Sequence, residues 1–129
     1  MMLPTGAAGK DLLVGVNRPV DPANLSDLER KHLPVIDAPE RVGKGRPFDV
    51  TIEVGRLLAH PNEVGHFIQS IELWADETFL AKVHLAPAGG RPKVTLRVSL
   101  HHAAAQLHAR SSCNLHGVWV GQKAISLEQ

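Results

Sequence analysis

The chain of 129 residues contains no tyrosine, a single cysteine and no long hydrophobic run. One cysteine excludes an internal disulfide, so the composition does not indicate an oxidising compartment. The apolar segment 12–16 is too short to span a bilayer, and the first ten residues lack the basic stretch and apolar core of a secretory signal. We therefore expect a cytoplasmic protein with no membrane partner.

An excess of charge of either sign is also missing. Fourteen basic side chains almost balance thirteen acidic ones, and no basic stripe is interleaved with aromatic residues. This balance gives no reason to expect nucleic acid as a partner. The length fits one domain with a modest core. Histidine, in contrast, is abundant at eight residues, and this enrichment requires an explanation.

Short strands dominate the expected secondary structure. Apolar and polar residues alternate with a period of two along 48–54 and 94–100, which predicts strands with one buried face. Four further segments have the composition of strands: 67–74, 79–85, 107–112 and 123–127. About seven short strands separated by turn signals predict an all-β fold, an immunoglobulin-like antiparallel β-sandwich, with a small barrel as the alternative.

The N-terminal part differs in composition from the rest of the chain. Its glycine, proline and small residues predict an extended arm over residues 1–28, followed by one sandwich domain over 29–129. Ser26 and Glu29 have the spacing of a capping box. They predict a single helical turn that ends before Pro34, because the residue preceding a proline avoids the helical region.

Five side chains on short loop-like segments have the chemistry of metal ligands. Cys113 and His116 stand three residues apart, His60 and His66 frame a second loop, and His32 lies in a third. Each of these residues alone is weak evidence for a metal site, because a lone cysteine is usually a small apolar side chain and loop histidines usually lie on the surface. Together they can converge at one end of the predicted sandwich. The remaining histidines are expected at the surface or half-buried: His84, His101, His102 and His108.

This set of donors narrows the choice of metal. One thiolate and four imidazoles exceed the tetrahedral set that zinc favours. A blue-copper site needs two histidines, one cysteine and usually an axial methionine, but Met1 and Met2 are far from Cys113 in the sequence. Five nitrogen and sulfur ligands with one open position suit iron that must bind a small molecule.

Three segments together resemble a known family. They are Lys31 to Ile36, His60 to Ile68 and Cys113 to Trp119. Their order and spacing are similar to those of superoxide reductase of the neelaredoxin type, which is equivalent to the iron-binding domain of desulfoferrodoxin. The likeness extends from about Glu29 to the C-terminus, and the Cys-Asn-x-His-Gly-x-Trp run is its most specific part.

The resemblance implies an immunoglobulin-like sandwich that holds one mononuclear iron, Fe2+ or Fe3+, per chain. It implies four equatorial histidine ligands, one axial cysteine and an open position for superoxide, which is reduced by one electron to hydrogen peroxide. The implied ligands are His32, His60, His66, His116 and Cys113.

The resemblance also implies the partners and a catalytic lysine. Lys31 matches the lysine beside the first histidine of the family, where its charge would attract superoxide and organise proton donation from water. Electrons would come from a donor such as rubredoxin or a flavin-linked reductase, because a single cysteine cannot build the second, four-cysteine iron site of some relatives. Relatives form homodimers or homotetramers. Backbone N–H groups of Leu115 and His116 are expected to bond the sulfur of Cys113.

One position departs from the family pattern. Many members carry a glutamate directly before the lysine, where it occupies the sixth iron position in the oxidised state, but this chain has Arg30. Glu29 is one residue earlier and has a capping role, so we predict that it does not bind the metal. Two alternatives stay open: a metal-binding or electron-transfer sandwich without turnover, including a copper protein, and a metal-free binding module.

Overall fold

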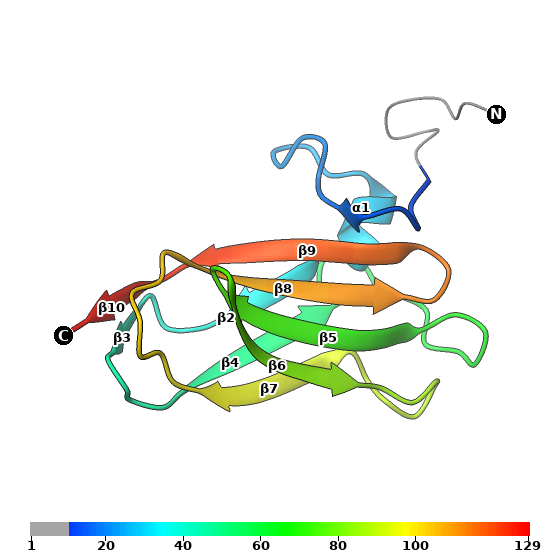
Figure 1. Ribbon diagram of the computed structural model, residues 1–129. Helices are drawn as coiled ribbons and strands as arrows, with labels where there is room; N and C mark the ends of the chain where they lie inside the picture. Colours follow the sequence, from blue (N-terminus) through cyan, green and yellow to red (C-terminus); the bar gives the residue numbers. More distant parts are fainter. Residues whose placement is uncertain (1–10) are drawn as a thin grey trace.

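The computed structural model describes residues 11–129, and the first ten residues of the predicted arm lie outside this range (Figure 1). One helix and ten strands follow in this order: β1 (Val16–Asn17), α1 (Asp27–His32), β2 (Pro34–Asp37), β3 (Arg41–Gly43), β4 (Phe48–Val54), β5 (Ile68–Ala75), β6 (Thr78–His84), β7 (Lys93–Val98), β8 (Gln106–Cys113), β9 (Gly117–Ala124) and β10 (Ser126–Glu128). Within 11–129, no helix has the length and apolar content needed to cross a bilayer.

Two sheets pack face to face and confirm the predicted all-β sandwich. The larger sheet has the order β1-β9-β8-β5-β6, the smaller has the order β2-β4-β7, and β10 pairs with β3 (Figure 1). The core lies between the sheets, and Ile52, Ile71, Leu73 and Leu107 are fully buried there. The pairing is antiparallel except at the β1–β9 and β10–β3 edges, which are parallel.

The strand predictions are confirmed for β4 to β8, within two residues at most ends, but β9 was largely missed. Its sequence begins at Gly117 and contains Gly121, which in a sequence indicate a turn and a break. In the structure a side chain at Gly121 would collide with the carbonyl oxygen of Pro34. Glycine is therefore required here because β2 approaches the β9 backbone closely.

Helix α1 begins and ends as predicted. Ser26 Oγ accepts from the Glu29 N–H at 3.1 Å, and Glu29 Oε1 accepts from the Ser26 N–H at 2.8 Å, which completes the capping box. Glu29 Oε2 also accepts from the Val20 N–H at 2.8 Å. The helix ends at His32 with Leu33 as its cap. The predicted boundary between residues 28 and 29 thus falls inside one continuous helix.

The described part of the arm packs against the start of β9. Asn17 is 1% exposed, and its side chain donates to the carbonyl oxygens of Leu12 at 2.8 Å and Val118 at 3.0 Å. Gly117 has φ +81°, and a side chain there would collide with the carbonyl oxygen of Leu12. The arm therefore covers the turn that joins β8 to β9.

Substitution of Glu29 by alanine is expected to destabilise the protein by about 1–2 kcal/mol, because the carboxylate accepts two hydrogen bonds at the start of α1, from the N–H groups of Ser26 and Val20, that alanine cannot accept. Burial raises the pKa of Glu29, but the donors at Ser26 and Val20 lower it more, and the net pKa is below its ordinary value. The carboxylate therefore contributes stability above about pH 4.3, the ordinary pKa of an unfolded glutamate, and loses it as the pH falls through the lowered pKa.

Urea unfolding at neutral and at acidic pH measures both effects. The difference between wild type and the Glu29→Ala variant should shrink in acid. Asp27, whose side chain is 81% exposed in the same helical turn, is the matched control, and its alanine variant should differ from wild type by less than about 0.5 kcal/mol. Equal losses for the two variants would refute the structural role of Glu29.

Candidate metal centre

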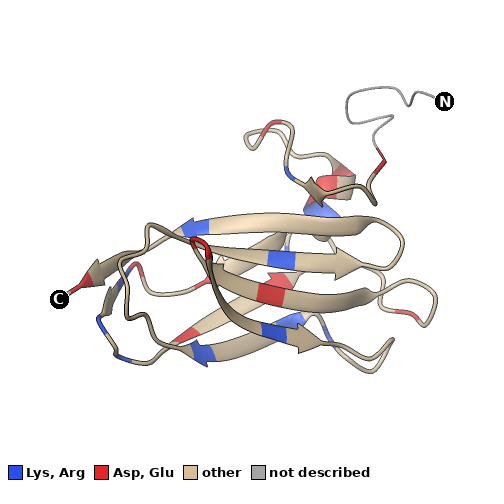
Figure 2. Ribbon diagram, in the orientation of Figure 1, with Lys and Arg blue, Asp and Glu red and all other residues tan. Residues whose placement is uncertain are grey.

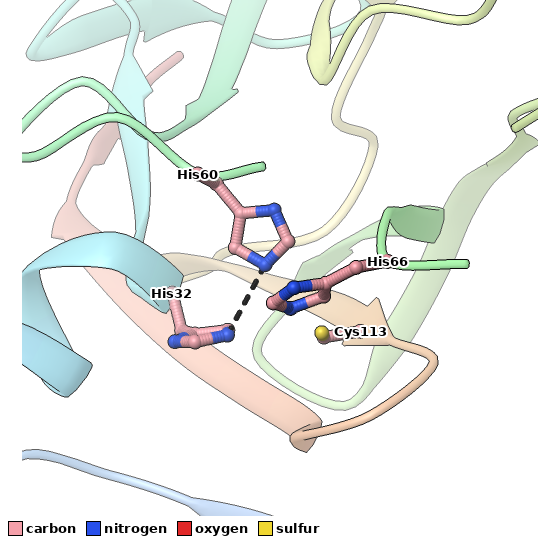
Figure 3. A group of neighbouring side chains, drawn as sticks. All are labelled: His32, His60, His66 and Cys113. Atoms are coloured by element: carbon pink, nitrogen blue, oxygen red, sulfur yellow. Dashed lines mark hydrogen bonds between the residues drawn. The ribbon is translucent and has the colours of Figure 1, made fainter. Parts of the chain in front are cut away.

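Four side chains from separate elements meet at one end of the sandwich. His32 is the last residue of α1, His60 and His66 lie in the loop between β4 and β5, and Cys113 ends β8. Their ligand atoms all lie within 4.8 Å of one another, and Figure 3 shows the side chains pointing toward a common centre. The four other histidines are exposed or half-buried, as predicted: His84, His101, His102 and His108.

Hydrogen bonds orient the first two imidazoles. His32 Nδ1 donates to the Leu28 carbonyl at 2.7 Å, and His60 Nδ1 donates to the Pro61 carbonyl at 2.6 Å. Both Nε2 atoms then face each other at 3.1 Å (Figure 3). Two nitrogens at right angles around one metal, each about 2.1 Å from it, lie about 3 Å apart. The pair therefore has the separation of two neighbouring ligands of one ion.

His66 presents a nitrogen that lacks a partner. Its Nε2 is buried, and among the described residues no group forms a hydrogen bond with it. The loop is folded by two backbone bonds between Glu63 and His66, at 2.9 and 3.1 Å, which place the ring at the cluster. A buried polar atom without a partner costs about 1–3 kcal/mol. A bound metal would satisfy this nitrogen, so the residue fits a ligand role.

The ring of His116 closes a circle of four imidazoles. Neighbouring ring centroids are separated by 4.7 Å for His32–His60, 4.9 Å for His60–His66, 5.0 Å for His66–His116 and 4.9 Å for His116–His32. The sulfur of Cys113 lies 3.6 Å from Nδ1 of His116. The structure therefore brings together all five side chains that the sequence analysis singled out.

The loop that carries the cysteine is bound on both sides. Asn114 accepts the Phe67 N–H at 2.9 Å and donates to the Gly65 carbonyl at 2.9 Å, so it joins this loop to the His66 loop. Backbone N–H groups of Leu115 and His116 bond the sulfur of Cys113, as expected. Burial raises the pKa of the Cys113 thiol, and these two N–H groups lower it less. The sulfur thus lies in a buried pocket with two donors.

Two supporting residues have structural roles that the sequence did not reveal. Trp119 is 2% exposed, and its ring stacks on that of His32 with a centroid distance of 5.2 Å and an interplanar angle of 22°. Its Nε1 donates a hydrogen bond to the His116 carbonyl at 2.9 Å. Ser111 Oγ donates to the His32 carbonyl at 3.1 Å. Trp119 belongs to the motif that carries the resemblance, but nothing in the sequence marks Ser111 as a neighbour of His32. Both hold a histidine in place.

The histidines are kept neutral by their surroundings. The pKa of His32 is lowered to about 4, and burial is the largest cause. Burial is also the main reason that the pKa values of His60 and His116 are lowered. The other imidazoles add to this effect, and the charge of Lys31 lowers the pKa of His60 and His116 further. Neutral imidazole is the form that binds metals. Lys31 therefore lies close enough to act on two of the rings.

The residues before Lys31 have partners outside the cluster. Arg30 donates to the Leu57 carbonyl at 3.2 Å and pairs with Asp27 at 3.5 Å. Both carboxylate oxygens of Glu29 are engaged at the start of α1. Within residues 11–129 no carboxylate belongs to the metal-binding group. The donors are thus nitrogen and sulfur atoms alone.

Comparison with known proteins gives the family. The desulfoferrodoxin family profile matches residues 24–122. A Methanocaldococcus jannaschii protein, named as a candidate superoxide reductase, is 41% identical over 80% of this chain and 89% of its own length. Superoxide reductase of Pyrococcus furiosus is 30% identical over 76% of this chain and 89% of its own.

A solved structure shows the same fold. A variant of superoxide reductase (neelaredoxin) from Ignicoccus hospitalis is 35% identical, covers 88% of this chain and 94% of its own, and has a TM-score of 0.75. The profile match spans more than half of the chain. Together with the identity to the Methanocaldococcus protein, this establishes that the chain belongs to the desulfoferrodoxin family.

Proposed function

We propose that this protein is a superoxide reductase with one mononuclear iron per chain. The closed circle of four imidazoles with a buried thiolate beside it carries this proposal, because it offers five soft and borderline donors and no carboxylate. The proposed ligands are His32, His60, His66, His116 and Cys113. The division into an arm over residues 1–28 and an iron-binding domain over 29–129 belongs to the same proposal, with helix α1 (Asp27–His32) joining the two parts across that boundary.

The orientation of each ring indicates the nitrogen that would bind. His32 and His60 would use Nε2, because their Nδ1 atoms donate to carbonyl groups. His116 would use Nδ1, which is the nitrogen that lies beside the sulfur of Cys113. Iron held by these residues would supply one electron to a small anion, and the thiolate of Cys113 would increase the electron density on the metal.

Lys31 would attract the substrate and help deliver its protons. Superoxide is an anion, and a lysine near His60 and His116 places positive charge where the substrate must arrive. The Nζ ammonium would hold a water molecule for proton delivery. One electron from the external donor and two protons convert each superoxide into one hydrogen peroxide.

The proposal includes the partners inferred from the sequence. A separate donor such as rubredoxin or a flavin-linked reductase would supply the electron, and the chain would act as a homodimer or homotetramer. A cytoplasmic location would keep the thiol of Cys113 reduced.

Iron content and the visible spectrum of the purified protein test the proposal. We expect close to one iron per chain and a long-wavelength sulfur-to-iron band that disappears with ascorbate and returns with superoxide. Iron that does not respond to superoxide would contradict the enzymatic proposal. Protein that takes up no iron after anaerobic reconstitution would contradict the metal site itself.

Neutralising Lys31 should slow the reaction with superoxide. For Lys31→Gln we expect about a tenfold lower second-order rate constant and a weaker dependence on salt, because the charge that steers the anion is removed. Stopped-flow mixing of the reduced protein with superoxide measures both. Lys93→Gln, an exposed position on β7, is the matched control. Equal rate constants for the two variants would remove Lys31 from the reaction.

Replacing Arg30 by glutamate should change the oxidised protein. The new carboxylate would stand directly before Lys31, where many members of the family carry a glutamate. The hydrogen bond from the Arg30 guanidinium to the Leu57 carbonyl would be lost. We expect the band of the oxidised iron to shift and its pH dependence to change, while Arg30→Gln leaves both close to wild type. An unchanged spectrum in Arg30→Glu would contradict the view that the wild-type site lacks a carboxylate ligand.

A further inference from the structure

A groove opens along the side of the sandwich where β2 and β9 lie next to each other. Strand β1 covers only the start of β9, because its register with β9 ends at Asn17 and Trp119. Pro19 and Pro22 follow in the arm, and proline has no N–H group with which to continue a strand pairing. Within the described residues, β2 pairs with β4 alone. The second half of β9 and the outer edge of β2 therefore leave a gap between the two sheets.

The groove has the size of a small-molecule site. It holds about 540 Å³, and residues of β2, of β9 and of the arm form its walls. Sites for small molecules typically have volumes of about 300–1,000 Å³. Most of the lining is apolar and includes Pro22, Val35, Leu57 and Val120. A hydrocarbon group that enters the groove would therefore leave water for an apolar surface, which is favourable.

Two cations line the groove, and among the described residues no carboxylate does. Figure 2 shows blue on the arm directly after β1 and near the end of β9, which correspond to Arg18 and Lys123. Neither of them joins any ion pair found within residues 11–129. Asp37, the residue after β2's Ile36, lies 3.4 Å from Arg56. The positive charge of the groove is thus not balanced by its own lining.

This combination differs from the rest of the surface. The chain as a whole has fourteen basic and thirteen acidic side chains, and on the smaller sheet Arg97 pairs with Asp49 at 3.0 Å. A charge excess confined to an apolar groove matches a ligand that has both properties. The apolar part of such a ligand is removed from water, while its charged group is paired and remains near solvent.

We propose that the groove binds a small organic anion with an apolar body. The body would lie against Val35, Leu57 and Val120, and the anionic group would be held by the charges of Arg18 and Lys123. An aliphatic carboxylate and an aromatic sulfonate share this chemistry. The affinities of two such probes distinguish an aliphatic from an aromatic ligand.

This site is separate from the metal centre, and the inference goes beyond the proposed function. The five proposed iron ligands, all within the described residues, are not part of the groove lining. The nearest lining residue in the chain is Leu33, directly after His32. Substitutions at the cations of the groove should change binding without changing iron content. Failure of this proposal and failure of the proposed enzymatic function can therefore be told apart in the same samples.

Calorimetric titration of the iron-loaded full-length protein tests the proposal. The aliphatic probe is decanoate and the aromatic probe is anilinonaphthalene sulfonate. We expect at least one of them to bind at one site per chain with a Kd of about 1 mM or tighter, and more weakly at high salt. At ten times its Kd, that probe should raise the unfolding temperature by at least about 2 °C, because it binds only the folded chain.

Substitutions in the groove should weaken this binding. The double variant Arg18→Gln/Lys123→Gln should bind at least about tenfold more weakly, because both charges that hold the anionic group are removed. Leu57→Glu should have an effect of similar size, because it places a negative charge in the groove at a side chain that is 41% exposed and so tolerates a polar group. Lys93→Gln, an exposed position on β7, is the matched control and should bind as wild type does.

Circular dichroism should show that all variants are folded. The proposal is overturned if neither probe binds, or if binding does not saturate at one site per chain. It is also overturned if the double variant or Leu57→Glu binds as tightly as wild type, or if Lys93→Gln weakens binding as much as the double variant.

Discussion

The Cys113→Ser variant is expected to lose the long-wavelength sulfur-to-iron band and to react with superoxide at least about a hundredfold more slowly. Changes to residues that merely support a metal ligand typically reduce affinity or activity by about 10–100-fold, so loss of a direct ligand should do at least as much. Cys113 is 2% exposed and receives two backbone N–H groups, so no other donor can replace its sulfur without a rearrangement of the loop. Absorption spectra and stopped-flow kinetics measure these two consequences, and the iron content shows how much metal the variant still holds.

A neighbouring serine supplies the control for this experiment. Ser112 is adjacent on β8 and points to the opposite face of the sheet, and within residues 11–129 its hydroxyl forms one hydrogen bond, to Gln69 Oε1 at 3.4 Å. Ser112→Ala should retain the band, the iron and the rate. A Cys113→Ser protein that keeps the wild-type band would show that the sulfur is not a ligand, and the proposed site would have to be abandoned.

The Gly121→Ala variant is expected to be less stable than wild type by about 3 kcal/mol and to release its metal more readily. The added methyl group would collide with the carbonyl oxygen of Pro34, and a backbone atom cannot move aside as a flexible side chain can. Pro34 follows His32 by two residues, so displacement of β2 also displaces a proposed ligand. Urea unfolding measures the stability, and the rate of metal transfer to a chelator measures the second effect.

Gly89→Ala is the matched control for this substitution. A methyl group at that position would meet only the Pro87 carbonyl oxygen at 3.9 Å, which is ordinary contact. Its stability should stay within about 0.5 kcal/mol of wild type. If Gly121→Ala were as stable as Gly89→Ala, the close approach of β2 to β9 would not be what positions His32.

Local signals in the sequence were sufficient to predict several elements of the structure. Ser26 and Glu29 specify the start of α1 because their mutual hydrogen bonds involve only residues three apart. The alternation from Phe48 to Val54 specifies β4 because one face of that strand is buried. The ligand candidates could be found because the chemistry of histidine and cysteine is evident without coordinates.

Other features depend on contacts between distant segments. Strand β9 could not be predicted, since Gly121 is required by the distant Pro34 rather than by a turn. Strand β1 has only two residues and exists through its pairing with β9 and the side chain of Asn17. The roles of Asn114 and Trp119 likewise follow from partners that are distant in the sequence, Phe67 for Asn114 and the ring of His32 for Trp119, which no local pattern reveals.

The stoichiometry of products tests the central claim most directly. Reduced protein is mixed anaerobically with a known amount of superoxide, and hydrogen peroxide and oxygen are both measured. A superoxide reductase with this site should yield one hydrogen peroxide for each superoxide consumed and no oxygen, because each electron comes from the protein and its donor. Release of one oxygen for every two superoxide ions would indicate dismutation, and unreacted superoxide would contradict an enzymatic role altogether.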